Sequence, residues 1–179
     1  MNRFSIEYPE YHIAEELQKI FPKKDNYAIC IPMSRQQKYY DLLLHNANNK
    51  RCITIQVKSS RTYLENKKEY NFYAWLNTFE VNEFSDLYFI YTSYPQFDEV
   101  TFSPKADFKT KILVFKQDEM KEIIQTIKTK SGKPDMFFGF GFNIKDDGIF
   151  GTRGFDTKKD FSDYIFNNRI KLLQDIINS

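Results

Sequence analysis

Residues 53–58 constrain the fold of this chain more than any other stretch, because apolar and polar side chains alternate strictly along them. The apolar positions are Ile53, Ile55 and Val57, and the polar ones are Thr54, Gln56 and Lys58. Successive side chains of a β-strand point to opposite faces of the sheet, so the alternation predicts a strand over residues 51–59 with one buried face. The polar face either lies in water or forms part of a site.

Other segments predict that this strand belongs to a mixed sheet. Short runs rich in aromatic and β-branched residues, which are typical of strands, cover residues 26–33, 38–44, 70–77, 86–94 and 112–116. The Asn-rich segment 45–50 is typical of a turn that joins two strands into a hairpin. Residues 86–94 are apolar almost throughout, which indicates a strand covered on both faces.

Helices are expected near both ends of the chain and after residue 117. Between Pro9 and Pro22, apolar residues recur at helical spacing: Ile13, Ala14, Leu17 and Phe21. Asp118 is expected to cap a second helix, and Asp156 or Thr157 a last one. Together the segments predict an α/β fold (α+β with a mixed sheet) in which helices flank a central sheet.

Composition and length indicate one globular domain over residues 1–179. The chain has 18 Phe and 12 Tyr against 6 Gly, so most of the rings are expected in the core and some along a binding face. The Gly- and Phe-rich segment 136–155 is expected to be a loop or a short hairpin. The net charge of +2 is too small to identify a nucleic-acid partner by itself.

The two cysteines, Cys30 and Cys52, lie outside any C-x-x-C motif. Two separated cysteines fit a reducing compartment better than a disulfide framework, and with His12 and His45 they lack the spacing of zinc ligands. Since no apolar segment is long enough to cross a membrane, we expect a cytoplasmic protein without a membrane partner.

Glu10 is the acidic residue of the first helix that shares its apolar stripe. It precedes Ile13 and Leu17 by three and seven residues, so its side chain is expected to face the body of the protein. The alternative is that an acid in the first turn simply complements the helix dipole. The sequence leaves both interpretations of Glu10 open.

Asp41 precedes the apolar run of one strand of the expected hairpin, and Gln56 and Lys58 lie on the other. A carboxylate beside buried residues is costly unless it is paired or binds a cation. The short turn allows Asp41, Gln56, the backbone carbonyl of Val57 and the ammonium of Lys58 to converge. Oxygen donors of this kind suit Mg²⁺. A strand-edge turn residue and a solvated polar face are the alternatives.

Three local motifs in this order resemble the PD-(D/E)xK nuclease superfamily, which includes many restriction endonucleases and the Holliday-junction resolvases. They are the helix PEYHIAEEL at residues 9–17, the strand YYDLLL at 39–44 and the strand IQVKSS at 55–60. The third motif matches the variant with Gln in place of the central acid. The resemblance implies a restriction-endonuclease-like core over about residues 1–130, followed by a C-terminal extension over about 131–179.

The resemblance also implies a metal-dependent deoxyribonuclease with a defined site. Asp41, Gln56 and the Val57 carbonyl would hold Mg²⁺, for which Mn²⁺ can substitute, with Glu10 as a direct or water-mediated ligand. Lys58 would position the water that attacks a phosphodiester of DNA. The residues expected to contact DNA are Ser59, Ser60, Arg61, Lys67 and Lys68. A homodimer is a further expectation, because relatives cut both strands as dimers.

Two other functions remain open from the sequence. Gln56 lacks the charge of the usual acid, which leaves a catalytically inactive module that binds nucleic acid or protein on the same fold. A metal-free interaction protein, such as an immunity or assembly factor, is the third candidate. Gln56 is thus the residue on which the active and inactive interpretations divide.

Overall fold

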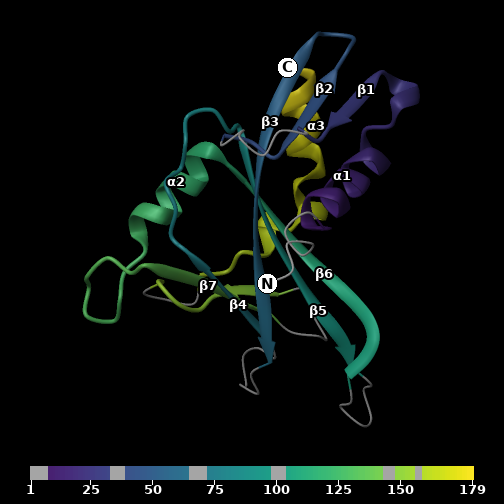
Figure 1. Cartoon of the computed structure of the whole chain (residues 1–179). Helices are drawn as coiled ribbons and strands as arrows, with labels where there is room; N and C mark the ends of the chain where they lie inside the picture. The colour runs from purple at the N-terminus through teal and green to yellow at the C-terminus, as the bar shows by residue number, and fades with distance from the viewer. Residues whose placement is uncertain (1–7, 33–38, 65–71, 98–103, 143–147, 156–158) are drawn as a thin grey trace.

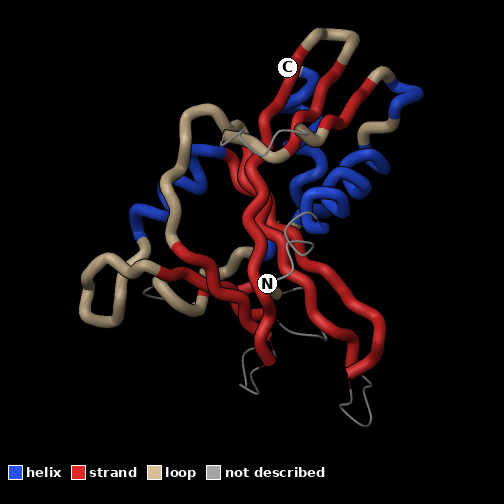
Figure 2. Tube along the Cα trace, viewed as in Figure 1, coloured by secondary structure: helices blue, strands red, loops and turns tan. Residues whose placement is uncertain are grey.

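The computed structural model describes residues 8–32, 39–64, 72–97, 104–142, 148–155 and 159–179. It is a mixed α/β fold (Figures 1 and 2). The helices are α1 (Tyr8–Ile20), α2 (Gln117–Thr126) and α3 (Ile170–Asn178), with short 3₁₀ turns η2 (Lys23–Asp25), η3 (Ser162–Tyr164) and η4 (Phe166–Arg169). The strands are β1 (Tyr27–Cys30), β2 (Leu42–Asn46), β3 (Arg51–Leu64), β4 (Phe72–Asn77), β5 (Leu87–Phe97), β6 (Pro104–Lys116), β7 (Phe137–Phe142) and β8 (Ile149–Gly151).

The sheet has eight strands and branches at β3, which is 14 residues long. The first part of β3 belongs to a sheet of order β1-β2-β3-β5-β6, called the first sheet below. Its last residues belong to a second sheet of order β3-β4-β7-β8. Strands β3 and β5 run parallel and the other pairs are antiparallel. Figure 1 shows β3 running through the centre of the molecule, with β1 and β2 beside one end and β4 beside the other.

Helices α1 and α3 cover one face of the first sheet. The apolar stripe of α1 packs with the inward residues of α3 and of the strands in one core: Ile13, Leu17, Phe21, Leu42, Leu44, Ile53, Ile55, Leu87, Phe89, Tyr91, Ile112, Val114, Phe166, Leu173 and Ile177. This arrangement confirms the helical spacing of the N-terminal segment and the alternation along β3. Helix α1, which carries Glu10, is therefore fixed against the first sheet. The core between this sheet and helices α1 and α3 is called the helical core below.

The opposite face of the first sheet packs against the second sheet and α2. Six Phe residues meet there, in a core called the aromatic core below and formed by Phe72, Ala74, Leu76, Tyr88, Ile90, Tyr94, Leu113, Phe115, Met120, Ile123, Ile127, Phe138, Phe140, Phe142, Ile149 and Phe161. Alternate residues of β5 enter the two cores, with Phe89 in one and Ile90 in the other. The prediction that residues 86–94 form a strand covered on both faces is confirmed.

Two predictions about helices are wrong. The N-cap of α2 is Lys116 rather than Asp118, because the carboxylate of Glu119 reaches back to accept the Lys116 N–H at 2.8 Å. The last helix begins only at Ile170. Phe161 packs in the aromatic core and Phe166 in the helical core, on the opposite face of the first sheet. Because the chain must place these two rings in different cores, it forms turns where a continuous helix was expected. Asp156 and Thr157, the expected caps, lie outside the described residues.

The segment 136–155 contains the hairpin of β7 and β8, which was one of its two predicted forms. Cys30 and Cys52 are free thiols at the surface. Within the described ranges, none of the helices has the length and apolar character needed to span a bilayer.

Candidate metal and phosphodiester site

Strand β3 has an open edge between the two sheets. Strand β2 pairs with residues 51–55 and β4 pairs with residues 62–64 on that side, while β5 pairs with residues 55–61 on the other. Among the described residues, no strand therefore pairs with residues 56–61 along the open edge. Backbone N–H and C=O groups at such an edge need other partners, which makes it a place where side chains or ligands can bind.

Asp41 occupies the start of this open edge. Its backbone N–H donates to the carbonyl of Ile55 at 2.8 Å, and its Oδ2 accepts the Val57 N–H at 2.6 Å. The same oxygen accepts a hydrogen bond from the side-chain amide of Gln56. Because the N–H and C=O of one strand residue point to the same edge, the Val57 carbonyl also faces the Asp41 side of β3. Asp41 is thus held in place by backbone bonds.

Gln56 and Lys58 project from the opposite face of β3 to Val57, toward the aromatic core. Gln56 is 7% exposed. The Lys58 Nζ lies 5.0 Å from the centroid of the Phe79 ring, a contact in which the ring face attracts the ammonium. Burial lowers the pKa of Lys58, and the negative charge of Asp41 acts in the opposite direction. The amine is consequently held in a partly apolar environment close to a carboxylate.

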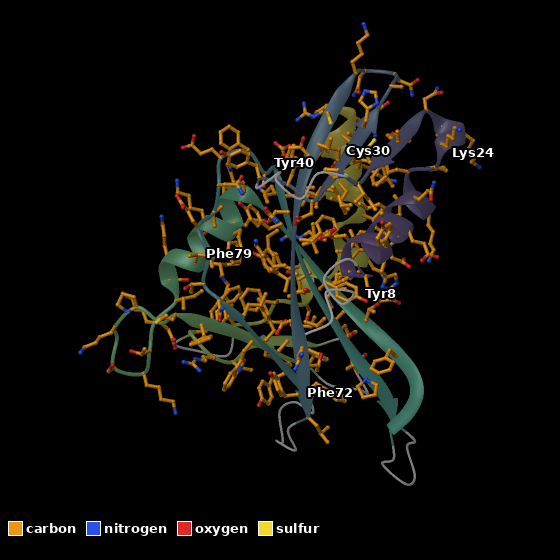
Figure 3. All side chains as sticks on the ribbon, in the orientation of Figure 1. Tyr8, Lys24, Cys30, Tyr40, Phe72 and Phe79 are labelled. Carbon is orange, nitrogen blue, oxygen red and sulfur yellow. The ribbon has the colours of Figure 1, made fainter. Side chains whose placement is uncertain are left out.

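Glu10 approaches the same place from the first turn of α1. Burial raises its pKa to about 7, and the negative charge of Asp41 adds to that rise. Burial also raises the pKa of Asp41, against the effects of the Val57 N–H, the Lys58 charge and the Gln56 amide. The two carboxyl groups are therefore close enough to interact. In the view of Figure 3, Tyr8 at the start of α1 and Phe79 lie on opposite sides of β3.

The donor set fits a divalent cation with oxygen ligands. Burial raises the pKa of both carboxyl groups, and a bound cation would stabilise their charged forms. The described residues contain no group of three or more His, Cys, Asp and Glu side chains placed to hold a metal. With two carboxylates, an amide oxygen and a carbonyl, the set matches Mg²⁺, which keeps several waters.

The expected DNA-contact residues have separate placements. Ser59 and Arg61 are exposed on the open edge. The hydroxyl of Ser60 donates to the carbonyls of Trp75 and Arg61, so this side chain contributes to the junction between β3 and β4. Lys67 and Lys68 lie outside the described residues.

Phe79 is the neighbour of Lys58 that sequence reasoning missed. It follows β4 in an irregular segment and is brought to β3 by packing against Tyr88 and Phe138. Neither spacing nor a motif in the sequence links it to Lys58. Only knowledge of how the second sheet packs on the first would identify the contact.

Comparison with known proteins gives no match for this chain, either to a family model or to a curated protein sequence. The arguments for a function therefore depend on the geometry described above.

Proposed function

We propose that this protein is a Mg²⁺-dependent nuclease that hydrolyses phosphodiester bonds of DNA. The observation that carries the proposal is the convergence of Glu10, Asp41, Gln56 and Lys58 at the open edge of β3. They come from three parts of the sequence, and their pKa shifts show that Glu10, Asp41 and Lys58 interact. Ionisable groups with shifted pKa values at a strand edge favour a functional site over a structural one.

The fold supports the finer proposal of a restriction-endonuclease-like core. The first sheet is mixed, with a central parallel pair formed by β3 and β5. Helices α1 and α3 flank one face, and α2 packs on the other. A restriction-endonuclease-like core has a central mixed sheet with flanking helices. The motifs at residues 9–17 and 55–60 lie on α1 and β3, and residues 42–44 of the second motif lie on β2, which Asp41 directly precedes.

The residues divide the chemistry between metal binding and water activation. Asp41, the Gln56 amide oxygen and the Val57 carbonyl would hold Mg²⁺, with Glu10 as a direct or water-mediated ligand. Bound Mg²⁺ supplies positive charge to the phosphate oxygens and lowers the pKa of a coordinated water. Lys58 donates hydrogen bonds that orient the attacking water and offset charge on the phosphate. The lowered pKa of Lys58 brings its amine nearer to the range in which it can exchange a proton.

A binding module without catalysis is the second candidate, and one contact favours it. The Asp41 carboxylate already accepts hydrogen bonds from Val57 and Gln56. A carboxylate satisfied within the protein needs no cation. In that case the site would serve only to fix Asp41 and the start of β2 against β3.

Cleavage assays on supercoiled plasmid and on branched DNA separate the two candidates. Wild type is expected to cleave with Mg²⁺ or Mn²⁺ and to be inactive with EDTA, and Asp41→Ala and Lys58→Ala are expected to lose at least about a hundredfold in rate. Glu15→Ala provides a matched control, since Glu15 is an exposed acid on the same helix. If the site variants cleave as well as wild type, catalysis lies elsewhere. If wild type binds DNA without cleaving it, the result supports the second candidate, a binding module without catalysis.

A further inference from the structure

The outer face of the second sheet carries a continuous row of π-electron groups, Tyr63, Tyr73, Trp75 and Arg153, called the aromatic row below. The rings of Tyr63 and Tyr73 stack with centroids 5.3 Å apart, and those of Tyr73 and Trp75 are 5.0 Å apart. The Arg153 guanidinium lies 5.0 Å from the centroid of Trp75. Tyr63 is 47% exposed and Trp75 is 41% exposed, so the row is open to solvent.

The sheet itself displays these rings. Along β4, Phe72, Ala74 and Leu76 face the aromatic core, so the intervening Tyr73 and Trp75 face outward. Their partners across the ladder on β7 are Gly141 and Gly139, which have no side chains to cover them. A Cβ on Gly139 would lie 2.4 Å from Cδ1 of Trp75, which means that the indole rests directly against the Gly139 backbone.

The charge of this region suits a polyanion. Strands β3, β4, β7 and β8 contain no Asp or Glu, and Arg61 of β3 is exposed two residues before Tyr63. Arg153 forms a forked ion pair with Asp135, with both N···O distances at 3.2 Å. That pair holds the guanidinium plane against Trp75 and, at 4.5 Å, against the Phe137 ring. Arg153 thus extends the stacking surface, while Arg61 supplies exposed positive charge beside it.

The aromatic row lies further along β3, on the face of the strand that carries Val57. Tyr63 follows Val57 by six residues and lies on the same face of the strand. At about 3.3 Å per residue the separation is roughly 20 Å. Between them, Ser59 and Arg61 are exposed along the open edge. A strand of nucleic acid whose phosphate is held at Val57 therefore has a path along this edge to the rings.

We propose that the aromatic row binds single-stranded DNA by stacking unpaired bases on Tyr63 and Trp75, while Arg61 contacts the intervening backbone. The proposal rests on the proposed nuclease function for the identity of its substrate, and it specifies that the substrate includes an unpaired strand next to the cleaved phosphate. Aromatic side chains combined with a cationic groove are the means by which proteins bind single strands regardless of sequence. The absence of acidic residues from all four strands favours this ligand over a second protein chain.

Trp75 is the single tryptophan of the chain, so its fluorescence reports on the row directly. Titration with a 12-nucleotide oligothymidylate in EDTA is expected to quench Trp75, and an abasic strand of equal charge is expected to bind more weakly without quenching. Tyr63→Ala should raise the dissociation constant about tenfold, whereas Tyr63→Phe should bind as wild type does. Phe108→Ala, which removes an exposed ring from β6, is the matched control and should have no effect.

Equal quenching by the abasic strand, or unchanged binding by Tyr63→Ala, would overturn the proposal. So would an absence of DNA binding together with a dimer in sedimentation that Tyr63→Ala dissociates, because the row would then be a protein interface. Asp41→Asn keeps this result separate from the nuclease proposal. Quenching retained in wild type and Asp41→Asn without any cleavage would defeat only the nuclease. Cleavage of plasmid without quenching would defeat only the aromatic row.

Discussion

The Asp41 carboxylate accepts the Val57 N–H at 2.6 Å, at the point where β3 has lost its partner strand β2. Replacing Asp41 by Asn keeps an oxygen that can accept this bond, so the free energy of unfolding should change by less than about 1 kcal/mol. Asp41→Ala leaves the Val57 N–H without this partner and should lower the free energy of unfolding by about 1–3 kcal/mol. Both variants are expected to lose Mn²⁺ binding, which calorimetry measures, while urea denaturation measures stability. Mn²⁺ binding retained by Asp41→Asn would contradict the ligand role of Asp41.

Gln56→Glu is expected to have opposite effects on the metal-free and metal-bound protein. The change removes the amide that donates to Asp41 and places a third acid beside two whose pKa values are already raised. The metal-free protein should therefore lose about 1–3 kcal/mol of stability at pH 8. Mn²⁺ affinity should rise about tenfold, and thermal denaturation with and without Mn²⁺ measures both effects. A variant that is destabilised without any gain in Mn²⁺ affinity would favour the metal-free interpretation of the site.

Glu10→Gln should stabilise the protein only at neutral and alkaline pH. The folded-state pKa of Glu10 is about 7 against an ordinary value of 4.5, so the folded protein binds this proton more tightly than the unfolded chain does. The resulting stability is complete below pH 4.5 and is lost as the pH rises through about 7. At pH 8 the free energy of unfolding of the variant should exceed that of wild type by on the order of 1 kcal/mol, after allowance for solvent screening. At pH 4 the two values should be equal. Urea denaturation at both values tests this, with exposed Glu15→Gln as a control that should show no such trend.

Mn²⁺ binding should strengthen as the pH rises from 6 to 8. A protonated Glu10 must release its proton before it can act as a ligand, and its pKa of about 7 lies within this range. Calorimetry in buffers of different ionisation enthalpy should detect a fraction of a proton released at pH 6.5 and almost none at pH 8.5. In Glu10→Gln this proton release should be absent. A release that is identical in the variant would assign the proton to another group.

Lys58→Met should separate metal binding from catalysis. The methionine fills the space beside Phe79 and removes a charge that is close to Asp41. Without that positive charge Mn²⁺ should bind at least as tightly as in wild type, because like charges near the cation are reduced. Plasmid cleavage should fall about 10²- to 10⁴-fold, the usual contribution of a positioned acid–base group. An equal loss of metal binding and cleavage would show that Lys58 acts only by maintaining the site.

The sequence predicted the parts of this structure that depend on local periodicity. The alternation at Ile53 and Ile55 identified the buried face of β3, and the spacing from Glu10 to Leu17 identified the buried stripe of α1. Asp41 could be singled out because a carboxylate beside a run of leucines requires a partner, and the partners turned out to be Val57 and Gln56.

Features set by packing between distant segments could not be predicted in this way. The extension of β3 as far as Leu64 depends on pairing with β4, which no local pattern reveals. The late start of α3 at Ile170 reflects the need to place Phe161 and Phe166 in different cores. The raised pKa of Glu10 depends first on its burial and then on its approach to Asp41 across the fold, and both are properties of the tertiary structure.

The sharing of β3 by both sheets couples their alignment. Sliding β3 by one residue would exchange its two faces, so Lys58 would turn toward α1 and Tyr63 toward the interior. Such a shift would have to occur in both sheets at once, since a single uninterrupted strand transmits it from Arg51 to Leu64. The register of β3 in each sheet therefore constrains its register in the other. A substitution that weakens the pairing of β4 with β7 would therefore alter the position of β3 beside Asp41. The effect would pass through the backbone of β3, without any contact between the two places.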